Sequence, residues 1–225
     1  MKSRRLVAGC DEAGRGPVVG DMFVAMVVLH DDSLPKLHAA GVRDSKKLSP
    51  RRREELLPEI LDAAEAVAVA RVPPSSIDMG NLNRLFTDAV CRLARKVISR
   101  GYSPSVLYID AAGSEDVVSH RVSTCLPQEV RVVAEHGADA RYIPVAAASI
   151  VAKVLRDWHI ETLKRLYGDM GSGYPSDPRT RAWLESYLRE HGKLPPVVRK
   201  SWATVRRLLG VKGRRTLLDY LGKGS

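Results

Sequence analysis

Near its N-terminus the chain reads Leu6-Val7-Ala8-Gly9-Cys10-Asp11-Glu12-Ala13-Gly14-Arg15-Gly16-Pro17-Val18-Val19-Gly20. Its apolar start predicts a buried strand, which leads two adjacent carboxylates into a Gly-Arg-Gly-Pro turn. Neighbouring residues of a strand point to opposite faces, so only one of Asp11 and Glu12 can lie on the inner face. Because a buried carboxylate is costly to desolvate unless a cation meets it, the pattern indicates a metal site. An ion pair of either acid with Arg15 in a loop explains this stretch equally well.

The composition is that of a globular protein, with 44% hydrophobic and 28% charged residues among 225. The longest apolar run, Met22 to Leu29, is far shorter than a membrane span, and the first residues lead into a strand pattern instead of a signal-peptide core. We therefore expect a cytoplasmic protein with no membrane contact. Three cysteines, Cys10, Cys91 and Cys125, lack C-x-x-C spacing, which argues against a disulfide framework or a zinc ribbon.

The charge balance favours a polyanionic partner. Thirty-six Lys and Arg face 26 Asp and Glu, a formal net charge of +10. The basic residues gather away from the acidic stretch, at Lys46-Lys47, Arg51 to Arg53, Lys193 to Lys200, Arg206-Arg207 and Lys212 to Arg215. A metal-dependent enzyme acting on nucleic acid needs this arrangement, because the cations neutralise phosphates that the carboxylates would repel. A solvated basic surface would have the same composition.

Apolar patterns along the chain alternate between the periods of strands and of helices. Met22 to Leu29 is predicted to form a hairpin with the first strand. Ser49 can cap a helix that has Pro50 at its first position and continues to Leu61. The other expected elements are strands at 66–72, 105–110 and 129–134 and helices at 81–100, 144–167, 179–190 and 200–209. Strands alternating with helices predict an α/β fold, with a mixed sheet because its first two strands form a hairpin.

A change of composition marks residues 168–178, which are rich in glycine, proline, serine and aspartate. We place a boundary there. It divides the chain into a domain of residues 1–168, which holds the expected strands, and a basic helical C-terminal region of residues 169–225.

Two further acids belong with the first pair. Asp110 ends the strand expected at 105–110, and Asp139 lies in a turn-like segment. Oxygen ligands suit Mg²⁺ or Mn²⁺, and two such ions roughly 4 Å apart can activate a water and stabilise the leaving oxygen of a phosphodiester. The four acids therefore indicate in-line hydrolysis, if they meet in space; surface aspartates after strands are also common.

Other catalytic sites fit the sequence poorly. Gly14-x-Gly16 is followed by Gly20, and Pro17 stands where a helix would begin, which argues against dinucleotide binding. The chain contains neither the G-x-x-x-x-G-K-[ST] motif of a phosphate-binding loop nor the H-E-x-x-H motif of a zinc hydrolase.

Six motifs, in order along nearly the whole chain, resemble the ribonuclease HII family. They are Asp11-Glu12-Ala13-Gly14-Arg15-Gly16-Pro17, Asp44-Ser45-Lys46-Lys47-Leu48-Ser49, Tyr108-Ile109-Asp110, Ala138-Asp139-Ala140-Arg141-Tyr142, the segment from Ala146 to Lys153 with Arg156-Asp157, and the segment from Gly171 to Pro178. Lys200-Ser201-Trp202 is similar to the archaeal form of the family.

The resemblance implies an RNase H-like mixed sheet flanked by helices, with a C-terminal helical extension. Residues 1–168 would be the catalytic domain and residues 169–225 a substrate-binding region. The implied enzyme is an endoribonuclease that hydrolyses the RNA strand of RNA/DNA hybrids and cuts 5′ of ribonucleotides embedded in duplex DNA, in ribonucleotide removal and replication primer removal. Water would attack with the help of Mn²⁺ or Mg²⁺, two ions during turnover, and leave a 3′-hydroxyl and a 5′-phosphate.

The resemblance also implies roles for single residues. The family's four catalytic, metal-binding acids match Asp11, Glu12, Asp110 and Asp139. Its Gly-Arg-Gly element, which reads the 2′-hydroxyl, matches Gly14, Arg15 and Gly16. A 2′-hydroxyl is the one local mark that separates a ribonucleotide from its deoxy neighbours, and the backbone of a glycine turn can approach it closely.

Three more residues are expected to touch substrate. Tyr174 matches the tyrosine that stacks at the RNA–DNA junction, although its surroundings alone favour a packed aromatic. Lys46 and Lys47 would form a solvated pair on a loop by composition, and the motif match favours contact with phosphate.

Two positions depart from the family pattern, with Gly137 where lysine is usual and Asp21 where proline is usual. The first would weaken a phosphate contact, and the second would be inert or alter metal preference. Lys153 and Asp157 are spaced for an ordinary helix ion pair, which we prefer to a role for Asp157 beside the site. The three tryptophans, Trp158, Trp183 and Trp202, are assigned to core or packing.

Two other functions remain open on the residues alone. One is a nuclease of the same acidic class that acts on DNA only, such as a transposase-like nuclease or a junction resolvase. The other is a basic nucleic-acid-binding module whose acids are structural. We expect a monomer. A sliding clamp is a conceivable partner, but Gly222-Lys223-Gly224-Ser225 contains no clear peptide motif for one.

Overall fold

A five-stranded mixed sheet lies at the centre of the protein, in the strand order β3-β2-β1-β4-β5. Its strands are β1 (Leu6–Ala13), β2 (Met22–His30), β3 (Ala64–Val72), β4 (Val106–Asp110) and β5 (Arg131–Glu135). The computed structural model describes residues 5–43 and 45–210; Asp44 and residues 211–225, which belong to a predicted motif and to the predicted C-terminal region, lie outside them.

The register of the sheet brings strand ends together. β1 pairs antiparallel with β2, which is the predicted hairpin, and parallel with β4. β4 in turn pairs parallel with β5, with Asp110 opposite Glu135. Because parallel strands run the same way, the carboxyl ends of β1, β4 and β5 lie at one edge of the sheet. The predicted mixed α/β sheet is confirmed.

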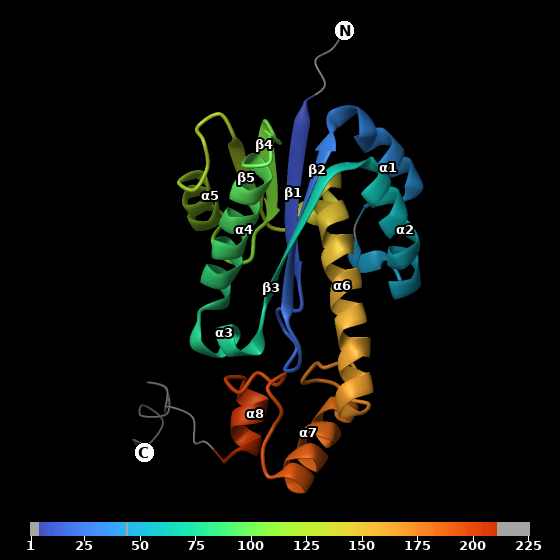
Figure 1. Ribbon diagram of the computed structural model, residues 1–225, viewed down its shortest axis with the longest axis vertical. Coiled ribbons are helices and arrows are strands. Elements are labelled where there is room, and N and C mark those ends of the chain that lie inside the picture. The colour runs from blue at the N-terminus through green and yellow to red at the C-terminus, as the bar shows by residue number, and fades with distance from the viewer. Residues whose placement is uncertain (1–4, 44, 211–225) are drawn as a thin grey trace, which may run out of the picture.

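Helices cover both faces of the sheet (Figure 1). The helices are α1 (Leu34–Ala40), α2 (Pro50–Ala63), α3 (Pro74–Met79), α4 (Leu82–Ile98), α5 (Glu115–Ser123), α6 (Ile143–Tyr167), α7 (Pro178–His191) and α8 (Ala203–Leu208), with short 3₁₀ turns η1 (Asp31–Ser33), η2 (Ser45–Lys47) and η3 (Ala138–Ala140). α6 packs on one face with α1 and α2, and α4 and α5 pack on the other. No helix in the described ranges is long and apolar enough to cross a membrane.

The predicted start of α2 is confirmed. The Ser49 side chain accepts a hydrogen bond from the Arg52 amide at the start of α2, with Pro50 at the first helical position. The sequence patterns did not predict α1, α3 and α5. These helices have only six to nine residues, too few turns for a helical period to stand out.

Successive residues of β1 face opposite sides of the sheet. Val7 belongs to the core under α6, whereas Ala8 and Cys10 belong to the core under α4. Gly9 faces α6, because a Cβ atom at this position would lie 2.0 Å from the Pro144 carbonyl carbon and 2.3 Å from the Val145 nitrogen. The first turn of α6 therefore rests directly on the backbone of β1.

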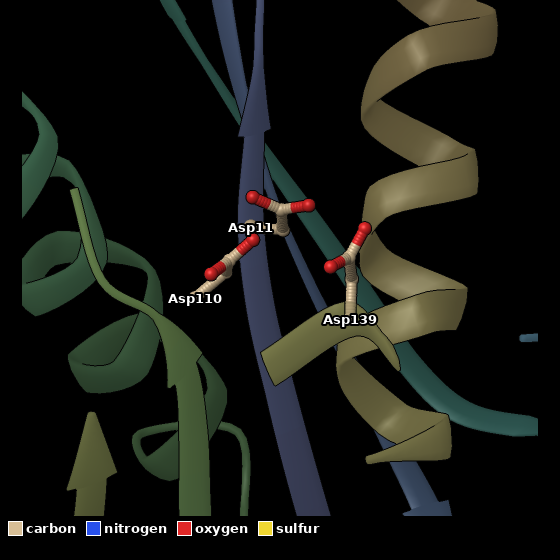
Figure 2. A group of neighbouring side chains, drawn as sticks. All are labelled: Asp11, Asp110 and Asp139. Carbon is tan, nitrogen blue, oxygen red and sulfur yellow. The ribbon is translucent and has the colours of Figure 1, made fainter. Parts of the chain in front are cut away.

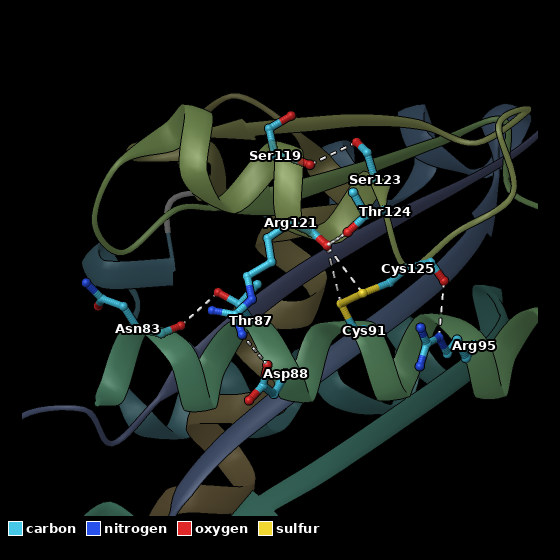
Figure 3. Close-up of a disulfide and its surroundings, with 10 residues drawn as sticks. All are labelled: Asn83, Thr87, Asp88, Cys91, Arg95, Ser119, Arg121, Ser123, Thr124 and Cys125. Carbon is cyan, nitrogen blue, oxygen red and sulfur yellow. Dashed lines mark hydrogen bonds and ion pairs between the residues drawn. A yellow bond between two sulfur atoms is a disulfide. The ribbon is translucent and has the colours of Figure 1, made fainter. Parts of the chain in front are cut away.

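One disulfide is present, which the cysteine spacing did not predict. Cys91 of α4 is bonded to Cys125, just beyond α5 (Figure 3). Cys10 is a buried free thiol. The bond ties α4 to the end of α5 on the same face of the sheet, and its partners are separated by 34 residues, so no local spacing could have indicated it.

The C-terminal helices have a core of their own that reaches the first turn of the chain. Val18 and Val19 pack with residues of α6, α7 and α8. The Val18 amide donates to the Gly173 carbonyl at 2.8 Å, and the Arg199 amide donates to the Val18 carbonyl at 2.8 Å. Residues after α6 thereby help to shape the Gly-Arg-Gly turn. The predicted division of the chain at residue 168 stays a prediction.

We predict that Gly9→Ala destabilises the protein, because the new methyl group would meet backbone atoms that cannot rotate away. Overpacking of this kind costs about 3 kcal/mol, which lowers Tm by roughly 6 to 12 °C in a chain of this size. Gly80→Ala is the control. There the nearest atom, 2.9 Å away, is the end of the flexible Leu85 side chain, so calorimetry should give a clearly smaller loss. Equal losses would contradict the close packing of α6 on β1.

Candidate active site

Three of the predicted acids meet at the carboxyl edge of the sheet. Asp11 projects from β1, Asp110 is the last residue of β4, and Asp139 lies on η3 (Figure 2). One carboxylate oxygen from each lies within 4.8 Å of the others. Asp11 and Asp139 are 5% and 2% exposed, so the cluster is largely closed to solvent.

The backbone explains why these acids converge. The parallel pairing of β1 with β4 sets Asp11 and Asp110 side by side. The amides of Gly137 and Ala138 donate to Asp110 Oδ1, at 2.8 and 3.3 Å, and so draw η3 onto the end of β4. Gly137 has φ 65°, a left-handed conformation that suits glycine. The departure from lysine at this position is therefore compatible with the local turn.

The electrostatics of the cluster call for a cation. Burial, followed by repulsion from Glu12 and Asp110, raises the pKa of Asp11 well above its usual value. Burial and repulsion from Asp139 likewise raise the pKa of Asp110. Carboxylates that resist ionisation in this way are stabilised by a bound cation, and an all-oxygen set is what Mg²⁺ and Mn²⁺ prefer. The residues present thus fit a divalent metal.

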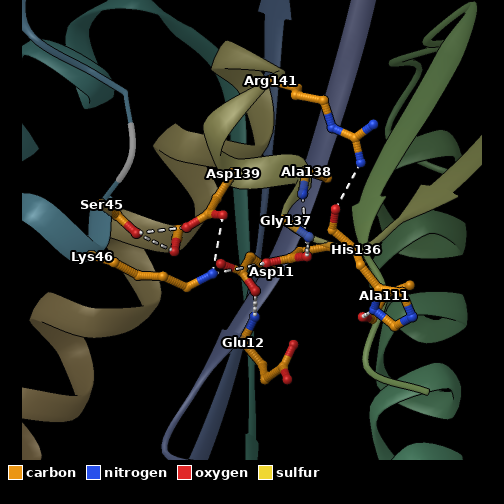
Figure 4. A network of polar contacts seen from close by, with 12 residues as sticks. Asp11, Glu12, Ser45, Lys46, Ala111, His136, Gly137, Ala138, Asp139 and Arg141 are labelled. Carbon is orange, nitrogen blue, oxygen red and sulfur yellow. Dashed lines mark hydrogen bonds and ion pairs between the residues drawn. The ribbon is translucent and has the colours of Figure 1, made fainter.

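Lys46 reaches into the cluster from η2. Its Nζ atom lies 3.3 Å from Asp139 Oδ1 and 3.9 Å from Asp110 Oδ2 (Figure 4). Burial lowers the pKa of Lys46, but attraction to Asp139 and Asp110 outweighs burial and raises it. The ammonium group therefore partly neutralises the acids. Lys47, the last residue of η2, is exposed.

A polar network beneath Asp139 holds that carboxylate in place. The Ser45 hydroxyl is 3.2 Å from Asp139 Oδ2 and 2.8 Å from the Ser149 hydroxyl. Lys153 Nζ donates to both serines, at 2.7 Å to Ser149. Burial lowers the pKa of Lys153, although attraction to Asp11 and Asp139 opposes the shift. Ser45 and Ser149 belong to two of the six motifs, but the sequence does not predict their contacts.

The predicted helix ion pair between Lys153 and Asp157 is wrong. Among the described side chains, Lys153 turns to the serines, and Asp157 pairs instead with Arg53 at 3.1 Å and Arg156 at 3.2 Å. The i,i+4 spacing permitted the pair, but Lys153 has closer partners in Ser45 and Ser149, and Asp157 has them in the two arginines.

Glu12 lies on the other face of β1. Its Oε1 atom accepts from Arg15 Nε at 2.8 Å, and Arg15 Nη1 donates to Asn83 Oδ1 at 2.8 Å. Its backbone amide donates to Asp11 Oδ1 at 2.7 Å. Burial raises the pKa of Glu12 although Arg15 opposes the shift. The predicted ion pair with Arg15 is therefore formed by Glu12, whereas Asp11 joins the acidic cluster.

One cavity of about 950 Å³ joins three of the four predicted acids to most of the predicted substrate residues. Its walls include Asp11, Glu12, Gly14, Arg15, Gly16, Lys46, Asp110 and Tyr174. Tyr174 lies over the turn, since a Cβ atom on Gly16 would be 3.4 Å from its ring. The Arg156 guanidinium lies 5.1 Å from the centre of the same ring. Sequence patterns alone did not identify Arg156 as part of the site.

Trp158 also belongs to the cavity wall, so its assignment to core or packing is wrong. It is 47% exposed, and its Nε1 atom donates to Glu54 Oε1 at 2.8 Å. Trp183 and Trp202 do pack against the core of the C-terminal helices, as predicted. An exposed indole is uncommon enough to suggest contact with a partner, yet in the sequence it cannot be told from a buried one.

Arg199 is a buried residue that the sequence did not single out. It is 0% exposed and donates to the carbonyls of Gly14, Arg15 and Gly20, at 2.6, 3.0 and 2.9 Å. Burial lowers its pKa to about 10. These bonds fix the Gly-Arg-Gly turn from beneath.

Asp21 lies outside the acidic cluster. Its Oδ2 atom is 2.6 Å from Arg71 Nη2, and its Oδ1 atom is 3.5 Å from His159 Nε2. Burial opposes ionisation, but the neighbouring His159 and the hydrogen bond from Arg71 lower the pKa of Asp21. Asp21 therefore connects the segment before β2 to Arg71 of β3 and His159 of α6, and among the described residues it does not belong to the group of three acids.

Comparison with known proteins shows what the chain is similar to. The family model described as ribonuclease HII matches residues 8–205 of this chain. Ribonuclease HII of Thermococcus kodakarensis is 48% identical over 205 residues, which cover 90% of this chain and 89% of that one. The crystal structure of ribonuclease H2 from Pyrococcus horikoshii has a TM-score of 0.82 at 41% identity and covers 90% of this chain and 96% of that one. RNase HII from Archaeoglobus fulgidus, solved in complex with PCNA, has a TM-score of 0.78 at 39% identity and covers 94% and 98%. The predicted RNase H-like fold and the family resemblance are confirmed.

We predict that Asp11→Asn stabilises the metal-free protein at pH 7. The raised pKa of Asp11 means that the native state holds its proton to a higher pH than the unfolded chain does. The free energy of unfolding therefore falls as pH rises above the unfolded value, near 4. Asparagine removes that penalty, and Tm should rise by about 2 to 4 °C for each kcal/mol recovered. The gain should disappear below about pH 4, where both states are protonated.

Asp21→Asn is the control with the opposite sign, because the lowered pKa of Asp21 stabilises the native state at pH 7. Thermal unfolding with chelator, Mg²⁺ or Mn²⁺ measures both effects. A divalent cation should raise Tm of the wild-type protein and of Asp21→Asn more than that of Asp11→Asn. A lower Tm for Asp11→Asn in chelator at pH 7 would contradict the account of the cluster.

Proposed function

Because the chain belongs to the ribonuclease HII family and is a ribonuclease H endonuclease, we propose that it cuts the RNA strand of RNA/DNA hybrids and incises 5′ of single ribonucleotides in duplex DNA. The observation that carries the proposal is the common cavity whose walls include Asp11 and Asp110 of the acidic cluster together with the Gly-Arg-Gly turn. Ribonucleotide removal and replication primer removal would be its roles.

Asp11, Asp110 and Asp139 would hold the divalent cation that the family uses, with Glu12 beside them. We propose Mg²⁺ or Mn²⁺, with two ions during turnover. When bound, such ions would favour the attack of water and neutralise charge on the phosphodiester, leaving a 3′-hydroxyl and a 5′-phosphate. The network of Ser45, Ser149 and Lys153 keeps Asp139 oriented for this task.

Lys46 and Lys47 are the proposed phosphate contacts. Lys46 lies against Asp139 and Asp110 on the cavity wall. With a divalent cation among the acids, an ammonium group there is repelled from the cluster and is free to pair with a backbone phosphate. Such contacts supply affinity without reading sequence.

Gly14, Arg15 and Gly16 would read the 2′-hydroxyl. Arg199 donates to the carbonyls of Gly14 and Arg15, and Trp202 Nε1 donates to the Gly16 carbonyl at 3.0 Å. A turn with all three carbonyls held can discriminate a small group, because selective sites need rigid support. These bonds come from residues beyond 168, which supports residues 169–225 as a substrate-binding region.

Tyr174 would stack on the nucleotide that follows the ribonucleotide. Tyr174 is 39% exposed, and its ring lies over Gly16 with the Arg156 guanidinium near it. An aromatic face at that sugar favours DNA, where no hydroxyl intrudes. Selectivity for the RNA–DNA junction would therefore arise from two neighbouring elements, one that accepts a 2′-hydroxyl and one that disfavours it.

We predict metal-dependent incision 5′ of a single ribonucleotide in a DNA duplex, and none in a matched all-DNA duplex. The assay uses Mg²⁺, Mn²⁺ and chelator, with Asp11→Asn as the variant. Loss of one cluster carboxylate should lower kcat at least about a hundredfold. Cutting of both duplexes would favour a DNA nuclease of the same acidic class, and binding without cutting would favour a nucleic-acid-binding module. Substantial turnover by Asp11→Asn in Mg²⁺ would remove the cluster from the mechanism.

We also propose a sliding clamp as partner, on the basis of the PCNA complex of the Archaeoglobus fulgidus relative. The candidate segment is Thr216-Leu217-Leu218-Asp219-Tyr220-Leu221, which lies outside the described residues. Leu217, Tyr220 and Leu221 have the i, i+3, i+4 spacing that suits a hydrophobic groove on a partner. A cytoplasmic location and a monomeric state stay predictions.

Changing Leu217 and Tyr220 together to alanine should weaken binding to purified Archaeoglobus fulgidus PCNA at least about tenfold, because apolar anchors dominate such contacts. Lys223→Ala is the control and should bind like the wild type. Calorimetric titration measures both. Unchanged affinity of the double variant would place the clamp contact elsewhere, and no binding by the wild type would remove this clamp as a partner.

A further inference from the structure

Asp157 joins two arginines on the wall of the catalytic cavity. Its Oδ2 atom is 3.1 Å from Arg53 Nη2, and its Oδ1 atom is 3.2 Å from Arg156 Nη1. The side chains of Arg53 and Arg156 are each only 13% exposed, and that of Asp157 is 28% exposed. Two largely buried cations on the same wall need an anion that offsets their charges, and Asp157 is that anion.

The ion pair with Arg53 anchors Asp157 to α2. Arg53 Nη1 donates to the Leu48 carbonyl at 3.0 Å, at the start of α2. The guanidinium is thereby held between the chain before α2 and the carboxylate on α6. This arrangement gives Asp157 a fixed position with respect to α2.

Arg156, the other partner of Asp157, contacts Tyr174, the residue proposed to stack at the RNA–DNA junction. Arg156 Nη2 donates to the Ser172 carbonyl at 2.6 Å, and its guanidinium lies 5.1 Å from the centre of the Tyr174 ring. Its Cγ atom also lies 3.4 Å from the point where a Cβ atom on Gly14 would be. Arg156 therefore touches both the segment that carries Tyr174 and the turn that would read the 2′-hydroxyl.

We propose that Asp157 is a positioning residue for junction selectivity: anchored through Arg53, it holds Arg156 under the Tyr174 ring and so fixes the ring over Gly16. The inference rests on the proposed function. Asp157 pairs with the two arginines and not with an acid of the cluster, and its effect passes through a cation–π contact that fails when Arg156 is free to turn away.

The test compares two substrates. A single ribonucleotide in DNA is followed by a deoxynucleotide, so each cut uses the Tyr174 contact. Inside a long RNA/DNA hybrid the next nucleotide carries a 2′-hydroxyl, and the contact contributes less. We expect Asp157→Asn to lower the ratio of kcat/KM on the first substrate to kcat/KM on the second by about tenfold, the scale of a partly desolvated cation–π contact.

Three further variants separate positioning from general stability. Asp88→Asn on α4 also removes a carboxylate between two arginines, Arg84 at 3.6 Å and Arg121 at 3.3 Å. Figure 3 shows Asp88 beside Arg121, and Asp88 is not among the residues that line the cavity. This variant should leave the ratio unchanged. Asp157→Glu keeps the charge and should restore most of the ratio. In a Tyr174→Ala background, Asp157→Asn should lower the ratio no further, because the ring through which it acts is gone.

Each outcome decides the question. Equal losses on both substrates, with a lower Tm, would make Asp157 a structural residue and overturn the inference. A further fall of the ratio in the Tyr174→Ala background would do the same, because Asp157 would then act by another route. Failure of the wild-type protein to cut either ribonucleotide substrate would instead overturn the proposed function.

Discussion

The contact between Gly9 of β1 and the first turn of α6 is the constraint on which the site depends. Any side chain at Gly9 would overlap the backbone of Pro144 and Val145. Because the helix rests directly on the strand, η3, which precedes α6, lies beside the end of β1, and Asp139 reaches Asp11. A side chain at position 9 would force the helix away from the strand and so move this aspartate away from its partners.

In the site, the carboxylates that repel one another and the lysines that attract them lie on different elements. The acids lie on β1, β4 and η3, whereas the cations that approach them, Lys46 and Lys153, come from η2 and α6. Neither lysine is adjacent in sequence to an acid that it approaches. The site therefore requires the complete domain, since no isolated strand or helix could hold several carboxylates at this spacing in a poorly solvated position.

Residues beyond α6 complete the other half of the cavity. The Gly-Arg-Gly turn has its carbonyls held by Arg199 and Trp202, and Tyr174 covers it from the segment after α6. The turn and the ring above it thus have one small core of their own, separate from the two cores of the sheet. The acidic cluster and the Gly-Arg-Gly turn therefore rest on different groups of residues.

The sequence by itself determined the features that depend on near neighbours along the chain. Local periodicity and capping predict the hairpin of β1 and β2 and the Ser49 cap. The same periodicity places Asp11 and Glu12 on opposite faces of β1. Only the tertiary structure decided that Asp11 joins Asp110 and Asp139 while Glu12 pairs with Arg15, that Asp157 prefers two arginines to Lys153, and that Cys91 meets Cys125. The reason is physical: local patterns fix which face a side chain occupies, but its partners are chosen by the packing of elements that lie far apart in the chain.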